Sequence, residues 1–336
     1  MEDKTAVQSQ MFANRLSKRF RHLKKWAQRT GAGAFRLYDR DIPEIPLVLD
    51  FYGNCTQIQN AALSGALYKR PYEKDDNDEN AWLSLMKQSA AVALGIKPEN
   101  VFLKQRQKQK GLLQYEKMGD ERFTQIVNEG GLFFKVNLSD YLDTGLFIDR
   151  RLLRAIVRAE SAGKKVLNLF SYTGAFSVYA AAGGAASTDS VDLSNTYLNW
   201  AKENFLLNGF KIGGAHKLIR ADALEYIDKA VKERMRWDII VADPPAFSNS
   251  KKMPDSFDLN RDLTDLLVKC LALLAPEGKI FASVNLRCGV PEARELEASL
   301  LENQTQKDLQ VIDLDNKIID EDFKNRKIPK AFLIMR

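Results

Sequence analysis

The chain has 336 residues, of which 45% are hydrophobic and 28% are charged, and its formal net charge is +6 at pH 7. This length is enough for roughly two domains with sizeable cores, and the composition is that of a globular protein rather than a disordered or fibrous one. No apolar run approaches the roughly 18 residues of a membrane helix, and the first ten residues are polar, so we expect neither a membrane span nor a signal peptide. Three widely spaced cysteines and two histidines form no zinc pattern and no disulfide framework, which favours a reducing, cytoplasmic setting without a metal site.

The first predicted element is a basic amphipathic helix over residues 11–30. Leu16, Phe20 and Leu23 recur at helical spacing, and the segment contains no acidic residue. Its seven cations are Arg15, Lys18, Arg19, Arg21, Lys24, Lys25 and Arg29. Such a charged face favours a phosphate backbone as partner, although an anionic membrane surface fits the charge almost as well.

Residues 35–140 are typical of a small α+β domain that follows this basic helix (1–34). Short alternating apolar runs lie within 35–59, and a helix is expected over 81–94, ending at Gly95. Strands are expected between 101 and 138, joined at glycines. A second group of cations, which includes Lys104 and Arg106, follows the strand-like residues 101–103.

The third part, residues 141–336, alternates strands with helices from about residue 149, which predicts a doubly wound α/β fold with a parallel sheet. The expected strands are 165–170, 187–193, 217–220, 237–242 and 279–285. The expected helices are 175–182, 195–207, 223–232 and 259–274. Residues 309–314 and 331–335 are expected to form a hairpin that closes the sheet.

Three successive strands of this sheet end in a carboxylate: Asp192, Asp222 and Asp243. Because parallel strands end at one edge, the three side chains should lie where open α/β sheets bind their ligands. Asp192 can accept hydrogen bonds from ribose hydroxyls, and Asp222 is placed to reach an adenine amino group. Each residue alone could equally cap the following helix, but three together favour one nucleoside-binding crevice.

Two turns at this edge carry further signals. Gly174, after the first strand, permits close approach of the backbone to a ligand, although an ordinary strand-to-helix turn explains it as well. The chain has no G-x-G-x-x-G motif there, which argues against a dinucleotide. After the fourth strand, Pro244 and Pro245 force the chain out of the sheet, and Phe247 follows, either to stack on a substrate or to fill a hydrophobic gap.

This combination resembles the class I S-adenosylmethionine-dependent methyltransferases. Longer segments are similar to the large-subunit ribosomal RNA methyltransferases of the RlmI/RlmK type, and above all to the half of the bifunctional members that methylates guanine N7 in 23S ribosomal RNA. The matching segments are 11–16, 136–147, 168–174, 243–252 and the motif Asp322-Phe323-x-Asn325-Arg326. The resemblance implies a Rossmann-like fold, S-adenosylmethionine as cofactor and large-subunit ribosomal RNA as substrate.

The resemblance also implies roles for individual residues. It assigns the methionine end of the cofactor to Phe170, Ser171, Tyr172 and Gly174, the ribose to Asp192, and the adenine to Asp222. A wall over the methionine part is implied for Thr144, Gly145, Phe147, Asp149 and Arg151, for which packing in a linker is the alternative. Asp243, Pro244 and Phe247 would border the reacting atoms, where Asp243 either assists the chemistry or only holds the cofactor.

Guanine N7 has two alternatives as the methylated atom, and a non-catalytic role is a third hypothesis. Guanine N7 carries a lone pair, so its methylation rests on alignment and electrostatics rather than on a general base. Methylation of an exocyclic amine such as guanine N2 goes with Asn-Pro-Pro-aromatic, whereas this chain has Asp-Pro-Pro-Ala. Formation of 5-methylcytosine requires a cysteine nucleophile. The resemblance to the RlmI type implies that this cysteine would follow directly after Ser283, where this chain has Val284. A non-catalytic RNA-binding assembly factor would not need the three aligned carboxylates.

RNA contacts are expected from Arg15, Lys18, Arg19, Lys25, Lys104, Arg106, Lys251 and Lys252. The bifunctional relatives implied by the resemblance also contain a THUMP domain and an N2-guanine methyltransferase, which we do not find in this sequence. A separate protein of that kind is therefore a candidate partner, and we expect a monomer or a homodimer.

Overall fold

The structure is a computed structural model that describes residues 4–70, 72, 74–105, 123–141, 143–248, 257–286, 289–302, 308–326 and 328–336. The chain forms two compact units, Met1–Ile148 and Asp149–Arg336. The division of the chain at residues 34 and 140 stays a prediction. Within the described residues, no helix is both long and apolar enough to cross a membrane.

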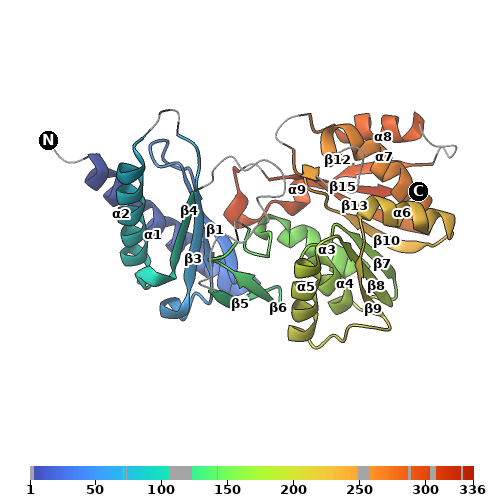
Figure 1. Ribbon diagram of the computed structural model, residues 1–336, viewed down its shortest axis with the longest axis horizontal. Helices are drawn as coiled ribbons and strands as arrows, with labels where there is room; N and C mark the ends of the chain where they lie inside the picture. The colour runs from blue at the N-terminus through green and yellow to red at the C-terminus, as the bar shows by residue number, and fades with distance from the viewer. Residues whose placement is uncertain are drawn as a thin grey trace. The chain divides into compact units, whose positions relative to one another are not determined.

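The first unit contains two long helices, a four-stranded sheet and a two-stranded ribbon (Figure 1). The helices are α1 (Lys4–Thr30) and α2 (Asp76–Leu94), and the sheet strands are β1 (Ala34–Asp39), β2 (Leu47–Tyr52), β3 (Ala62–Leu67) and β4 (Val101–Gln105). Strands β1 to β3 are antiparallel, whereas β3 and β4 are parallel because α2 crosses over between them. The ribbon pairs β5 (Thr124–Glu129) with β6 (Leu132–Asn137). Short 3-10 helices lie at η1 (Ile58–Asn60) and η2 (Pro98–Asn100).

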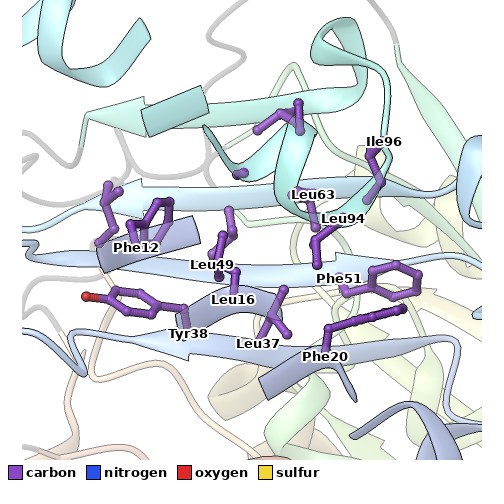
Figure 2. Packing of buried hydrophobic residues seen from close by; sticks show 14 of the residues in the cluster. Phe12, Leu16, Phe20, Leu37, Tyr38, Leu49, Phe51, Leu63, Leu94 and Ile96 are labelled. Atoms are coloured by element: carbon purple, nitrogen blue, oxygen red, sulfur yellow. The ribbon is translucent and has the colours of Figure 1, made fainter. Parts of the chain in front are cut away.

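The apolar side of α1 belongs to the core of this unit. Phe12, Leu16 and Phe20 are buried against the sheet, as Figure 2 shows. Phe20 and Phe51 of β2 lie with their ring centroids 5.3 Å apart. Helix α1 begins seven residues before the expected residue 11, and its buried residues run from Phe12 to Ala27.

The second unit is built on a seven-stranded sheet with the order β14-β15-β13-β10-β7-β8-β9. Its strands are β7 (Lys165–Leu169), β8 (Ser187–Asp192), β9 (His216–Arg220), β10 (Trp237–Ala242), β13 (Leu274–Val284), β14 (Gln310–Asp313) and β15 (Lys330–Met335). The five strands from β13 to β9 are parallel, and β14 and β15 form the antiparallel hairpin at one edge. This arrangement is the doubly wound α/β fold that the strand–helix alternation predicted.

Helices cover both faces of this sheet. They are α3 (Arg151–Glu160), α4 (Ala175–Ala182), α5 (Asn195–Leu207), α6 (Ala223–Lys232), α7 (Leu259–Ala272), α8 (Ala293–Glu302) and the short α9 (Asp315–Ile318). Helices α3 and α4 pack on the face that carries Val166 and Val241, and α6 and α7 pack on the opposite face with Leu167 and Ile240. A two-stranded piece, β11 (Phe247–Ser248) with β12 (Phe257–Asp258), and the 3-10 helices η4 (Ile148–Arg150) and η5 (Glu321–Phe323) complete the described elements.

Candidate functional site

The candidate site of the second unit lies at the carboxyl edge of its parallel strands. Strand β7 pairs with β8 on one side and with β10 on the other, so the strand order reverses at β7. Asp192, Asp222 and Asp243 stand at or just after the ends of β8, β9 and β10. Ligands of open α/β sheets bind outside the strand ends at such a switch point.

The turn from β7 into α4 has an unusual backbone. Phe170, Tyr172 and Gly174 have φ angles of 53°, 50° and 73°, in the left-handed region that is costly for the two aromatic residues. The backbone N–H of Ser171 donates to the carbonyl of Val191 at 2.9 Å, which ties the turn to β8. The turn is thus held in one conformation with its backbone at the strand ends.

Gly174 also has a packing role. A Cβ atom at this position would lie 2.8 Å from Cβ of Ala201 on α5. Any larger residue would push the start of α4 away from α5, and its positive φ disfavours other residues as well. The space beside Gly174 is therefore filled by protein, and its predicted role near a ligand stays a prediction.

Asp192, at the end of β8, binds the backbone of the turn between β7 and α4. Its Oδ2 accepts from the backbone N–H of Tyr172, and its Oδ1 accepts from that of Ser194, both at 2.8 Å. Burial raises the pKa of Asp192, and the two backbone hydrogen bonds oppose this rise. Ser194, rather than Asp192, caps α5 by accepting from the N–H of Tyr197. The Asp192 carboxylate keeps further lone pairs with which it can accept ribose hydroxyls.

Asp222 is a helix cap. Its Oδ1 accepts from the backbone N–H groups of Leu224 at 2.9 Å and Glu225 at 3.3 Å, which fixes the start of α6. The capping role that the sequence left open is therefore the one that the side chain performs. Its Oδ2 takes no part in these two bonds, and contact with an adenine amino group stays a prediction.

Arg150 and Asp243 form an ion pair that the sequence did not predict. Arg150 donates from Nη2 to Oδ1 at 3.1 Å and from Nε to both carboxylate oxygens at 3.3 Å. The Arg150 side chain is only 6% exposed, and its Nη1 also lies 3.1 Å from Oδ2 of Asp149. Burial opposes the charge of Arg150, but the two carboxylates outweigh burial and raise its pKa. The only sequence signal was the position of Arg150 beside Asp149.

Three buried oxygen atoms near this edge have no hydrogen-bond partner among the described residues: Oγ of Ser171, Oδ1 of Asp149 and Oγ of Ser283. Ser283 follows Ala282, which pairs with Ala242, so Ser283 is level with Asp243 on the adjacent strand. Unpaired buried polar atoms are costly and call for a partner. Ser171 and Asp149 are thus suited to bind a polar ligand.

Arg151 was predicted to lie over a cofactor, but its guanidinium is engaged within the protein. It is buried and contacts Asp320 at 2.8 Å and Asp322 at 3.2 Å through Nη1. Asp322 belongs to the C-terminal motif that the sequence analysis singled out. Arg151 therefore connects α3 to that motif, and this contact accounts for its charge without a ligand.

Pro244 and Phe247 differ in exposure. Pro244 is buried, whereas the Phe247 side chain is 55% exposed on β11, opposite Asp258 of β12. Phe247 therefore does not fill a hydrophobic gap, which was one of its two predicted roles. Its ring is available for contact with a flat ligand, as the other role requires.

Thr144 and Phe147 belong to the first unit. Oγ1 of Thr144 lies 2.9 Å from the hydroxyl of Tyr52, and the Phe147 side chain is 40% exposed. Their part, and that of Gly145, in a wall over a cofactor stays a prediction.

The predicted RNA-binding cations are placed in different ways. Lys18 and Lys25 are exposed on α1, as are Arg21 and Arg29, which the prediction left out. Arg15 pairs with Asp41 at 2.7 Å, and Arg19 is partly buried.

Lys104 differs from the cations of α1 because its ammonium points into the first unit. It donates to the carbonyl of Tyr141, and burial lowers the pKa of Lys104 to about 8 against the opposing charges of Asp143 and Asp140. The geometry thus disfavours Lys104 as a phosphate contact. Arg106, Lys251 and Lys252 lie outside the described residues.

Comparison with known proteins adds an independent observation. The family model of S-adenosylmethionine-dependent methyltransferases matches residues 55–313. Ribosomal RNA large subunit methyltransferase K of Neisseria meningitidis serogroup B is 46% identical over 323 residues, covering 96% of this chain and 86% of that protein. Ribosomal RNA large subunit methyltransferase K/L of Shewanella amazonensis is 42% identical, and the match covers 96% of this chain but 43% of the relative. The chain thus spans less than half the length of that K/L relative.

A solved structure supports the fold. A proposed methyltransferase in complex with S-adenosylhomocysteine (SAH) superposes with a TM-score of 0.75, covering 98% of this chain and 82% of that chain. At 24% identity this likeness concerns the fold alone.

Proposed function

Because the chain belongs to the S-adenosylmethionine-dependent methyltransferase family, we propose that it methylates N7 of a guanine in large-subunit ribosomal RNA. The relative from Neisseria, similar over most of both chains, supports the RNA substrate by its name. The observation that carries the choice of N7 is the ion pair between Arg150 and Asp243.

The chemistry of the base connects this ion pair to N7. Asp243 is the carboxylate closest in sequence to the Pro-Pro turn, and Arg150 donates to both of its oxygens. A carboxylate held in this way is poorly placed to accept a proton from a substrate. Guanine N7 has a free lone pair and loses no proton on methylation, so alignment and electrostatics suffice.

S-adenosylmethionine is the cofactor, and it supplies an electrophilic methyl group when bound. The residues at the carboxyl edge fit this molecule. Ser171 and Asp149 offer buried polar atoms that have no partner among the described residues. The Ser171 hydroxyl is suited to the carboxylate of the cofactor, and the Asp149 oxygen is suited to its amino group. Asp192 offers acceptors for the ribose, and Asp222 retains an oxygen for the adenine amino group.

Phe247 is the residue we assign to the target base. Its exposed ring can stack on a guanine that has been extruded from paired RNA, and stacking orients the base without a proton transfer. Asp243 contributes negative charge beside a ring that becomes cationic on N7 methylation. Both contributions act on alignment and charge.

The alternatives within the same fold have less support. A 5-methylcytosine enzyme needs a cysteine nucleophile. The position after Ser283, where the cysteine is expected, is Val284, which is fully buried at the end of β13. Methylation of guanine N2 requires removal of a proton, for which the paired Asp243 is a poor acceptor.

We assign RNA binding to the outer face of α1, defined by Lys18, Arg21, Lys25 and Arg29. These exposed cations recur every three or four residues and lie opposite the buried face, in a helix without an acidic residue. The apolar residues of α1 from Phe12 to Ala27 belong to the core of the first unit, so this part of the helix is not available for insertion into a membrane. A phosphate backbone is therefore the partner that this basic face fits better.

Mass spectrometry of ribosomal RNA from cells that lack the protein tests the proposal. We expect the loss of one 7-methylguanosine from the large-subunit RNA, restored by the wild-type gene. Complementation by a variant with Asp192→Ala serves as the control for cofactor binding. An unchanged pattern of 7-methylguanosine would refute the proposed substrate.

A further inference from the structure

We propose that Arg150 is a positioning residue of the methyl-transfer site, which holds the Asp243 carboxylate in the orientation in which it contacts the cofactor. The inference rests on the proposed function only for the identity of the bound molecule. It concerns a residue that no sequence motif pointed to.

The geometry of the pair fits orientation rather than charge alone. Three N–H···O contacts of 3.1–3.3 Å join one guanidinium edge to one carboxylate, so the carboxylate plane is fixed relative to Arg150. The Asp243 side chain is 15% exposed, so it is still reachable at the edge of the sheet. A fixed carboxylate that keeps some exposure is suited to contact a ligand.

The position of the pair supports a role at the ligand. Asp243 follows Ala242, which pairs with Leu169 of β7 on one side and with Ala282 of β13 on the other. Asp243 therefore stands between the ends of two neighbouring strands, at the point where the strand order reverses. Arg150 occupies the N-cap position of α3, and its side chain reaches Asp243 from there.

The charge around Arg150 also fits a cationic ligand. Arg150 is shared by two carboxylates, Asp149 and Asp243, so the three side chains carry one excess negative charge. Oδ1 of Asp149 is buried without a partner among the described residues. An ammonium group, which SAH shares with S-adenosylmethionine, would complete this arrangement, because it would neutralise the excess charge and pair with the free oxygen.

Arg151 provides an internal comparison. It follows Arg150 directly and is equally buried, but it contacts Asp320 and Asp322. Arg150 is the N-cap residue of α3 and Arg151 is the first residue of the helix, and the two arginines contact two different carboxylate sets. The set that Arg150 contacts includes Asp243 at a strand end of the candidate site, and the other set belongs to the C-terminal segment.

The test is a double-mutant cycle in which the SAH affinity of each variant is measured by calorimetry. The variants are Arg150→Gln, Asp243→Asn, their combination and Arg150→Lys, with Lys232→Gln on the exposed side of α6 as a control. Arg150→Gln is expected to weaken SAH binding about tenfold at a temperature where the variant is folded, and Asp243→Asn to do the same. The combined variant should bind no more weakly than Asp243→Asn alone, because Arg150 acts through Asp243.

Arg150→Lys should bind SAH with intermediate affinity, because an ammonium retains the charge but cannot form the planar fork. A purely structural role would lower only the melting temperature, so unchanged SAH affinity in folded Arg150→Gln would overturn the proposal. Additive losses of SAH affinity in the combined variant would also overturn the proposal, because they would mean that Arg150 contacts the ligand itself. Full SAH affinity in Asp243→Asn would overturn it as well. If the wild type binds SAH but methylates no ribosomal RNA, the proposed function fails while this cycle still decides the role of Arg150.

Discussion

Arg151, at the first residue of α3, donates from Nη1 to Oδ1 of Asp322 at 3.2 Å, across 171 residues of sequence. Asp322 is fully buried, and Asp320 joins the same guanidinium at 2.8 Å. The motif around Asp322 therefore has a structural task in the second unit, which is to close the C-terminal segment against α3.

Breaking this buried pair should destabilise the second unit. We expect Arg151→Gln to lower the free energy of unfolding by about 3–5 kcal/mol, because it leaves buried carboxylates without their cation. Chemical denaturation followed by circular dichroism measures this. The exposed pair of Lys279 with Glu160 is the control, and Lys279→Gln should cost less than about 1 kcal/mol. An equal cost for the two substitutions would contradict the structural role of Arg151.

Asp192 should give cofactor binding a distinctive dependence on pH. Its pKa is raised by burial, so on acidification it takes up a proton at a higher pH than an ordinary aspartate, whose pKa is about 3.8. The protonated form loses acceptor capacity for ribose hydroxyls, so SAH affinity should fall as pH is lowered toward that raised pKa. Calorimetry at a series of pH values tests this expectation. Asp192→Asn should bind SAH about tenfold to a hundredfold more weakly at neutral pH, which corresponds to the loss of hydrogen bonds to a charged group. The variant should also lose this part of the pH dependence.

Phe247 should affect the rate of methylation and leave cofactor binding intact. Phe247→Ala removes an exposed ring, so it should cost little stability, but stacking on a base is worth about 1–3 kcal/mol. We therefore expect a loss in kcat/KM for RNA of about fivefold or more, with wild-type SAH affinity. Phe247→Trp should retain most of the activity, since it keeps a stacking surface. Wild-type kinetics in Phe247→Ala would remove this residue from the substrate site.

The basic face of α1 should determine the salt dependence of RNA binding. Replacing Lys18, Arg21, Lys25 and Arg29 with glutamine should weaken affinity and reduce the slope of log affinity against log salt by about 0.7–0.9 for each phosphate that the protein no longer neutralises. Filter binding at several salt concentrations provides the slope. A control with the same change of charge replaces the exposed residues Lys202, Lys211, Lys217 and Lys232. The assignment fails if the two sets of substitutions change the slope equally.

Periodic patterns in the sequence predicted most of the second unit. Strand β10 and helices α4, α5 and α6 have the predicted bounds, because apolar runs and capping residues mark their ends clearly. Helix α3 was missed because its buried positions include Arg151 and Arg154 in place of apolar residues. A buried arginine looks like a surface residue until its carboxylate partners are known.

The side-chain roles at the site were harder to predict than the elements. The position of Asp192 and Asp222 at strand ends followed from the strand pattern, but whether each caps a helix depends on local backbone geometry. The pairing of Arg150 with Asp243 joins residues 93 positions apart and depends on how α3 packs beside β10. No spacing rule within a sequence encodes such a contact.

Methylation of guanine N7 is tested most directly by analysis of nucleosides after a reaction in vitro. Purified protein is incubated with large-subunit ribosomal RNA from the deletion strain and isotopically labelled S-adenosylmethionine, and the digested RNA is examined by mass spectrometry. We predict that the label appears in 7-methylguanosine, and that the Asp192→Ala variant transfers little or none. Label in 5-methylcytidine or N2-methylguanosine, or no transfer by the wild type, would contradict the proposed methylation of guanine N7.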